Sequence, residues 1–160
     1  MPRDATTKDL TVTPTGDSVV LRNGVGTAAF HVTNNSGLPF LVRVEPNPLT
    51  PPPPSKIKPA VKQWLSVAGS DRFQLGDGES HDFAIQVDAS SASKTTADQT
   101  YMFSLTAVSH EAPEAHWGES DPVVFTVLAP KPPKIPWPLI AAAVVLLILI
   151  GVGAIFLFNR

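Results

Sequence analysis

Cysteine is absent from the 160 residues of this chain. The chain therefore forms no disulfide bond, carries no thiol nucleophile and offers no thiolate ligand to a metal. Basic charge is also scarce over most of the sequence: residues 1–130 hold 9 Lys and Arg against 14 Asp and Glu, a net charge of −5. Since nucleic-acid-binding proteins neutralise phosphates with clustered Lys and Arg, we expect no nucleic acid partner.

The motifs of several enzyme classes are missing as well. The sequence has no Gly-x-Ser-x-Gly elbow, no P-loop and no Gly-x-Gly-x-x-Gly, which excludes common signatures of hydrolases, NTPases and dinucleotide-binding enzymes. The four histidines have neither the i, i+4 spacing nor the cysteine partners of a recognised metal site. We therefore predict a non-enzymatic protein without metal or cofactor, in which His31 and His81 are solvent-exposed strand residues.

One long hydrophobic run, LIAAAVVLLILIGVGAIFLF, occupies residues 139–158. A helix of this length spans about 30 Å, the thickness of a bilayer's hydrocarbon core, so the run predicts a transmembrane helix in contact with membrane lipid. Residues 130–138 are rich in proline and lysine and predict a semi-rigid linker, while residues 159–160 form a short tail. The residues that flank the run are expected at the membrane interface: Lys131, Lys134, Trp137 and Arg160.

The orientation of this predicted anchor follows from two weak signals. The first twelve residues, MPRDATTKDLTV, lack the apolar core of a secretory signal peptide. Positive charge near a span favours its cytoplasmic side, and Lys131 and Lys134 lie on the side of the head, residues 1–129. We therefore predict a single-pass, tail-anchored protein with a cytoplasmic head. The alternative is an exported head whose leader has been removed.

Short stretches of alternating apolar and polar residues recur in the head, and none has the 3.6-residue period of an amphipathic helix. The dipeptide Asn23-Gly24 is a strong signal for a two-residue hairpin. The segment Asn34-Asn35-Ser36-Gly37 contains a formal glycosylation sequon but is also typical of a turn. These patterns predict an all-β fold, an immunoglobulin-like antiparallel β-sandwich over residues 1–129.

Two segments of the head, residues 46–59 and 111–121, do not follow the alternating strand pattern. Residues 46–59 contain seven prolines and are predicted to form a long loop that cannot join a sheet. Residues 111–121 are predicted to form an acidic loop, in which Trp117 stands outside the core pattern. Tyr101, the only tyrosine, is either the tyrosine corner of an immunoglobulin-like domain or an ordinary core aromatic.

The segment FHVTNNSGLPFLVRVE resembles the strand–turn–strand hairpin of bacterial immunoglobulin-like domains in the NEW3 and CARDB-like group. Three further segments follow in the order of that group: WLSVAG, FQLGDGESHDFAIQV and TYMFSLTAVS. The resemblance covers about residues 5–129, with the proline-rich insertion as a departure. It implies an immunoglobulin-like fold in a bacterial membrane protein. Some similar short membrane proteins are encoded near contractile injection systems, which suggests an accessory role for such a phage-tail-like particle.

The first functional hypothesis is a membrane-tethered protein-binding or docking module. Proline runs are preformed ligands and tryptophan is enriched at interfaces, so the candidate contact residues are Pro51, Pro52, Pro53, Pro54 and Trp117. The proline run is otherwise a stiff solvated loop, and Trp117 otherwise folds back onto the sandwich. Two other functions stay open: an extracellular carbohydrate-binding or adhesion module, and a structural subunit of a membrane complex.

Overall fold

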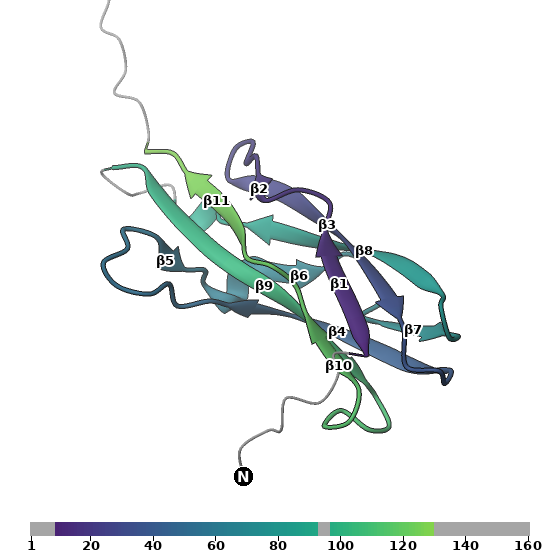
Figure 1. The fold of residues 1–160 in the computed structure, drawn as a ribbon. Coiled ribbons are helices and arrows are strands. Elements are labelled where there is room, and N and C mark those ends of the chain that lie inside the picture. The colour runs from purple at the N-terminus through teal and green to yellow at the C-terminus, as the bar shows by residue number, and fades with distance from the viewer. Residues whose placement is uncertain (1–8, 93–96, 130–160) are drawn as a thin grey trace, which may run out of the picture. The chain divides into compact units, whose positions relative to one another are not determined.

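The computed structural model describes residues 9–92 and 97–129, and Figure 1 shows their fold. The long elements of this part are all strands, which confirms the all-β prediction. In chain order the elements are β1 (Leu10–Pro14), β2 (Ser18–Val19), β3 (Val25–Asn34), β4 (Phe40–Pro48), β5 (Lys58–Pro59), the 3-10 turn η1 (Lys62–Trp64), β6 (Leu65–Val67), β7 (Arg72–Leu75), β8 (Ser80–Asp88), the 3-10 turn η2 (Ser90–Ala92), β9 (Gln99–Ser109), β10 (Trp117–Glu119) and β11 (Val123–Val127).

The predicted linker over residues 130–138 and the predicted transmembrane helix over residues 139–158 lie outside the described residues. Among the residues that the structure does describe, no helix is long and apolar enough to cross a membrane.

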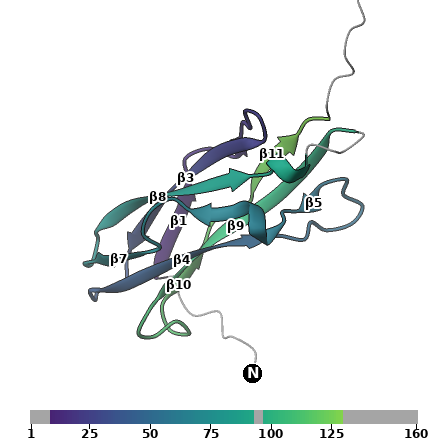
Figure 2. The ribbon, with the colours of Figure 1, turned by 180° about the vertical axis from the view of Figure 1, so that it is seen from behind.

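The described strands form two sheets that face each other (Figures 1 and 2). The first sheet has the order β1-β3-β8-β6, and the second has the order β2-β11-β9-β4-β7, with β5 and β10 also paired to β9. Most connections between consecutive strands pass from one sheet to the other, including those from β1 to β2, β2 to β3 and β3 to β4. This arrangement is an immunoglobulin-like β-sandwich, as the sequence predicts.

The core lies between the sheets and consists of the apolar residues that alternate along the strands. Its largest fully buried side chains include Phe30, Phe103, Phe125, Leu10, Ile85 and Leu105. Phe30 from the first sheet meets Phe103 from the second edge to face, with ring centroids 6.1 Å apart. Burial of each such side chain stabilises the fold by about 1.5–3 kcal/mol, so the period-two pattern accounts for the pairing of the two sheets.

The predicted hairpin at Asn23-Gly24 is confirmed. Both residues have positive φ angles, 54° and 83°, the backbone shape that a two-residue hairpin turn requires. The flanking residues close the turn: the Arg22 N–H donates to the Val25 carbonyl (2.7 Å), and the Val25 N–H donates back (3.0 Å). A side chain at Gly24 would also collide with the backbone of Ser90, so glycine is required there for space as well.

The proline-rich segment departs from the prediction at both ends. β4 continues through Pro46 and Pro48 and pairs with β9, and β5 returns to pair with Tyr101 and Met102 of β9. The Val44 N–H donates to the Asp71 carbonyl, away from β9 (2.9 Å). Because alternate residues of a strand share a direction, Pro46 and Pro48 lack only N–H groups on the edge away from β9. The prediction that the whole segment stays out of a sheet is therefore wrong.

The predicted loop at residues 111–121 contains a strand. β10 pairs with β9 in the register Trp117 to Val108, Gly118 to Ala107 and Glu119 to Thr106. Gly118 is buried against the backbone of Leu10 in β1, so β10 joins the two sheets at this corner. The interpretation of Trp117 as a loop residue is therefore wrong; it is a half-buried strand residue.

The sequence also makes predictions for three aromatic side chains: Tyr101, His31 and His81. The Tyr101 hydroxyl donates to Gln99 Oε1 (2.7 Å) rather than to an upstream backbone group, so Tyr101 is an ordinary core aromatic and not a tyrosine corner. His31 is exposed, as predicted, and donates to Asp82 (2.7 Å). His81 is half-buried because its ring stacks on Phe73, with centroids 3.3 Å apart; the prediction that His81 is solvent-exposed is therefore wrong.

Candidate functional site

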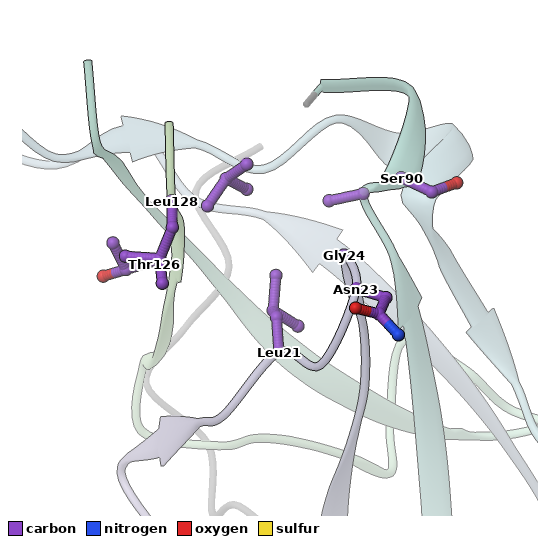
Figure 3. A pocket seen from close by; sticks show the side chains of 8 residues that line it. Leu21, Asn23, Gly24, Ser90, Thr126 and Leu128 are labelled. Carbon is purple, nitrogen blue, oxygen red and sulfur yellow. The ribbon is translucent and has the colours of Figure 1, made fainter. Parts of the chain in front are cut away.

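An apolar groove lies at one end of the sandwich, where β2 and β11 meet the turn between β2 and β3. Two adjoining hollows of about 400 and 250 Å³ form it, and both are lined by Leu21, Thr126 and Leu128. Figure 3 shows Leu21 between the segment of Thr126 and Leu128 and the segments that carry Gly24 and Ser90. Volumes of this size are large enough to receive side chains of a ligand.

Exposed apolar side chains gather at this groove. Val20 and Leu128 line it and are 79% and 63% exposed, the two highest values among the large exposed apolar residues of the described part of the chain. Scattered single exposed residues are ordinary, but apolar residues that share a concave site indicate an interaction surface. We therefore take this groove as the candidate site.

One wall of the groove is a strand edge. The two residues of β2 pair in parallel with Val124 and Phe125 of β11, and β2 covers no more of that strand. The Val124 N–H donates to the Asp17 carbonyl (3.0 Å), which identifies the edge of β11 that faces β2; β11 itself continues to Val127. An extended peptide could pair there while its side chains enter the groove.

Polar contacts fix the rim of the groove. The Ser90 hydroxyl and backbone N–H both donate to Asp88 Oδ1, at 2.6 and 3.1 Å. These two hydrogen bonds lower the pKa of Asp88, so this exposed carboxyl group stays ionised at neutral pH. The N–H of Ala129, the residue after Leu128, donates to Asp98 Oδ1 (2.8 Å). This hydrogen bond fixes the backbone directly after Leu128.

The predicted site residues Pro51, Pro52, Pro53 and Pro54 lie elsewhere, at the tip of the insertion between β4 and β5. Pro51 is half-buried and the other three are exposed. The base of the insertion is held by Lys62 Nζ, which donates to Glu45 Oε1 (2.7 Å). This hydrogen bond is the main cause that lowers the pKa of Glu45. The structure thus fixes the base of the insertion, and binding by its tip stays a prediction.

The predicted site residue Trp117 lies on the outer face of the second sheet, opposite Val108. Its strand pairs with residues 106–108 of β9, whereas β11 beside the groove and β5 at the proline insertion pair with residues 99–103 of that strand. The structure therefore does not bring the two sets of predicted contact residues together. The predicted membrane-interface residues Lys131, Lys134, Trp137 and Arg160 lie outside the described residues.

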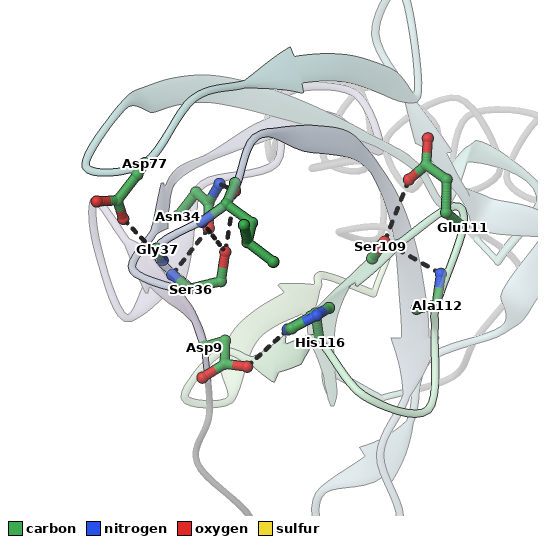
Figure 4. A network of polar contacts seen from close by, with 10 residues as sticks. Asp9, Asn34, Ser36, Gly37, Asp77, Ser109, Glu111, Ala112 and His116 are labelled. Atoms are coloured by element: carbon green, nitrogen blue, oxygen red, sulfur yellow. Dashed lines mark hydrogen bonds and ion pairs between the residues drawn. The ribbon is translucent and has the colours of Figure 1, made fainter.

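A cluster of polar side chains, which includes Asp9, Ser109, Glu111 and His116, is held together by hydrogen bonds (Figure 4). His116 Nδ1 donates to Asp9 Oδ2 (2.7 Å) while its ring stacks on Phe40, with centroids 5.1 Å apart. The Ser109 hydroxyl donates to Glu111 Oε2 (3.2 Å), not to His116. Residues 9–92 and 97–129 contain no group of three His, Asp or Glu side chains that could hold a metal ion.

Sequence reasoning missed the groove because Leu21 and Leu128 are far apart along the chain. Each looks like an ordinary strand-end residue in the sequence. The one available signal is that Val20 and Leu21 both precede the hairpin at Asn23-Gly24 without the alternation of the other strands.

The chain matches no protein-family model and no curated protein, so its membership of the NEW3 and CARDB-like group stays a prediction. Among solved structures it is similar to PapD-like domain 7 of human CEP192, at 6% identity and a TM-score of 0.43, over 78% of this chain and 87% of that one. It is similar to the E. coli chaperone DraB at 17% identity and a TM-score of 0.43, over 75% of this chain and 56% of that one. For the C. elegans MSP family member WR4, the values are 6% identity, a TM-score of 0.39, and 78% and 100% coverage.

Proposed function

We propose that this chain is a non-enzymatic, membrane-tethered module that binds a protein partner through the groove between β2 and β11. The observation that carries the proposal is the combination of exposed Val20 and Leu128 with a strand edge that, among the described residues, β2 covers only at Val124 and Phe125. The apolar wall favours burial of partner side chains, and the edge offers backbone hydrogen bonds.

The opposite free edge supports the same assignment. Beyond Arg43, no strand of the described residues pairs with β4 on the side away from β9, and Pro46 and Pro48 remove two of the N–H groups that a partner strand would need there. Prolines at an edge oppose strand addition. An extended partner therefore finds better pairing groups at β11 than at β4.

The tether in this proposal is the apolar run at residues 139–158, which has the length of a membrane span. A tether raises the effective concentration of a partner at the membrane without new contacts. The resemblance of the sequence to short bacterial membrane proteins suggests a contractile injection particle as that partner. In this proposal the sandwich faces the cytoplasm.

The groove is tested by Leu128→Asp, assayed by co-purification of partners from a mild detergent extract. An aspartate in the apolar wall must be desolvated when a partner binds, so we expect loss of the partner by tenfold or more. Val61→Asp is the matched control, since Val61 is an exposed apolar residue away from the groove. Both variants should unfold at the temperature of the unaltered chain. Equal partner recovery from the two variants would refute the groove as the binding site.

Orientation has a separate test. A cysteine introduced at exposed Ser90 gives the chain its single thiol, because the sequence has no other cysteine. If the head is cytoplasmic, a membrane-impermeant maleimide should label it in lysed cells but not in intact ones. Labelling of intact cells to the same extent would place the head outside and favour the adhesion hypothesis.

A further inference from the structure

A row of four residues crosses the outer face of the second sheet, away from the groove. The pairing registers place Trp117 opposite Val108, Val108 opposite Arg43, and Arg43 opposite Arg72. Directly opposed residues of antiparallel strands lie on the same face of a sheet. The inward neighbours Ala107, Val42 and Gly118 are buried, so the row lies on the outer face of β10, β9, β4 and β7 (Figure 1).

The two arginines of this row are an unusual pair. Like charges placed directly opposite each other in a sheet are destabilising, and this head is otherwise acidic, with a net charge of −5 over residues 1–130. Arg72 has a long contact of 3.8 Å with Asp71, and both side chains are about half exposed. Within the described residues, Arg43 has no ion-pair partner.

The neighbouring row on the same face contains two acidic residues, Glu45 and Glu119, which both lie opposite Thr106. Each already accepts a hydrogen bond from another side chain. Glu45 accepts a hydrogen bond from Lys62 Nζ (2.7 Å), and Glu119 accepts one from the Ser104 hydroxyl (2.7 Å). Arg43 acts on the Glu45 carboxylate more weakly than Lys62 does, and within the described residues neither carboxylate forms an ion pair with Arg43 or Arg72. The row thus has an apolar half, made of Trp117 and Val108, and a cationic half, made of Arg43 and Arg72.

We infer that this row is a second partner-contact surface that takes an acidic segment of a protein. An apolar side chain of the segment packs on Trp117 and Val108, and a carboxylate lies between Arg43 and Arg72. The centres of the two halves are two strand spacings apart, about 10 Å, which is about one turn of polyproline II chain, in which side chains three positions apart lie on the same face. The preferred ligand therefore has an apolar residue and an acidic residue about three positions apart.

The inference deepens the proposed function, because it names the chemistry of a partner, but it uses a different surface. Arginine and tryptophan are the residues most enriched among interface hot spots, and arginine binds carboxylates through paired hydrogen bonds. An acidic partner also relieves the repulsion between the two arginines, which an uncharged partner does not.

The test uses the full chain in neutral detergent and two capped peptide pools. Both pools have a leucine followed three positions later by a fixed residue, which is glutamate in one pool and glutamine in the other. We expect the glutamate pool to bind at least tenfold more tightly, with a preference that shrinks at high salt. The double variant Arg43→Gln and Arg72→Gln should abolish the preference, and Trp117→Ala should weaken binding of both pools severalfold.

Two controls keep this test separate from that of the groove. Arg22→Gln removes an exposed arginine of the hairpin turn and should leave the preference unchanged. Leu128→Asp should also leave it unchanged, so that the groove and this row can fail independently. Equal binding of the two pools, or a preference that persists in the double variant at unchanged thermal stability, would overturn the inference.

Discussion

Replacement of Gly118 by alanine should lower the stability of the sandwich by about 3 kcal/mol, near the upper end of the range for overpacked sites. A Cβ at Gly118 would overlap the Leu10 carbonyl oxygen and would also collide with its carbonyl carbon. These are backbone atoms, so no rotamer change can relieve the collision. β1 must move away from β10, and the corner between the two sheets opens.

Thermal unfolding of the full chain in detergent, followed by near-ultraviolet circular dichroism, measures this effect. A loss of this size lowers the melting temperature of such a domain by roughly 10 °C. Gly16→Ala is the matched control, since its nearest neighbour would be an oxygen at 3.9 Å and its φ is not positive. That variant should be neutral or slightly stabilising. Similar melting temperatures for the two variants would contradict the close approach of β10 to β1.

Local patterns made the strands and the first hairpin predictable from the sequence. The alternation of Phe40, Val42 and Val44 needs no knowledge of the partner strand, and Asn23-Gly24 fixes its turn through its own backbone preferences. The position of Gly118 is different. It depends on the contact between β10 and β1, which come from opposite ends of the described chain, so no local signal marks that glycine.

Pairing with β9 explains the two wrong loop assignments. Proline excludes a strand only where its missing N–H would face a neighbour, and the direction in which Pro46 and Pro48 face depends on the register of β4 on β9. Likewise, Trp117 and Glu119 of β10 form a strand because β9 extends beyond β11 and leaves an edge to cover. The groove at Leu128 lies beside another edge of the same sheet, where β2 pairs with only two residues of β11, and it too follows from strand lengths rather than from composition.

A large loss is also expected at Asn34, which the sequence marks as part of a sequon. Its side chain is completely buried and connects two turns (Figure 4). Nδ2 donates to the Leu38 carbonyl (2.8 Å) and to the Leu75 carbonyl (3.1 Å), and Oδ1 accepts from the Ser36 N–H (3.0 Å). The nitrogen that a glycan would need is therefore already engaged, and the residue serves the turn, as its sequence context favours.

Asn34→Ala should destabilise the sandwich by about 3 kcal/mol, since it removes the Asn34 partner of the Leu75 carbonyl and of the Ser36 N–H, and each buried unpaired group costs about 1–3 kcal/mol. The Leu38 carbonyl keeps a hydrogen bond from the Ser36 hydroxyl (3.0 Å). Asn35→Ala is the control: that side chain is exposed and makes one hydrogen bond, to Thr11 Oγ1 (2.9 Å). It should cost less than about 1 kcal/mol. Asn34→Asp provides a second readout. It keeps the acceptor for Ser36 but sets a carboxylate against two carbonyl oxygens, so its melting temperature should rise toward that of the unaltered chain as the pH falls and the carboxyl group gains a proton. A pH-independent loss in Asn34→Asp, or equal losses in the two alanine variants, would show that Asn34 does not hold the two turns together.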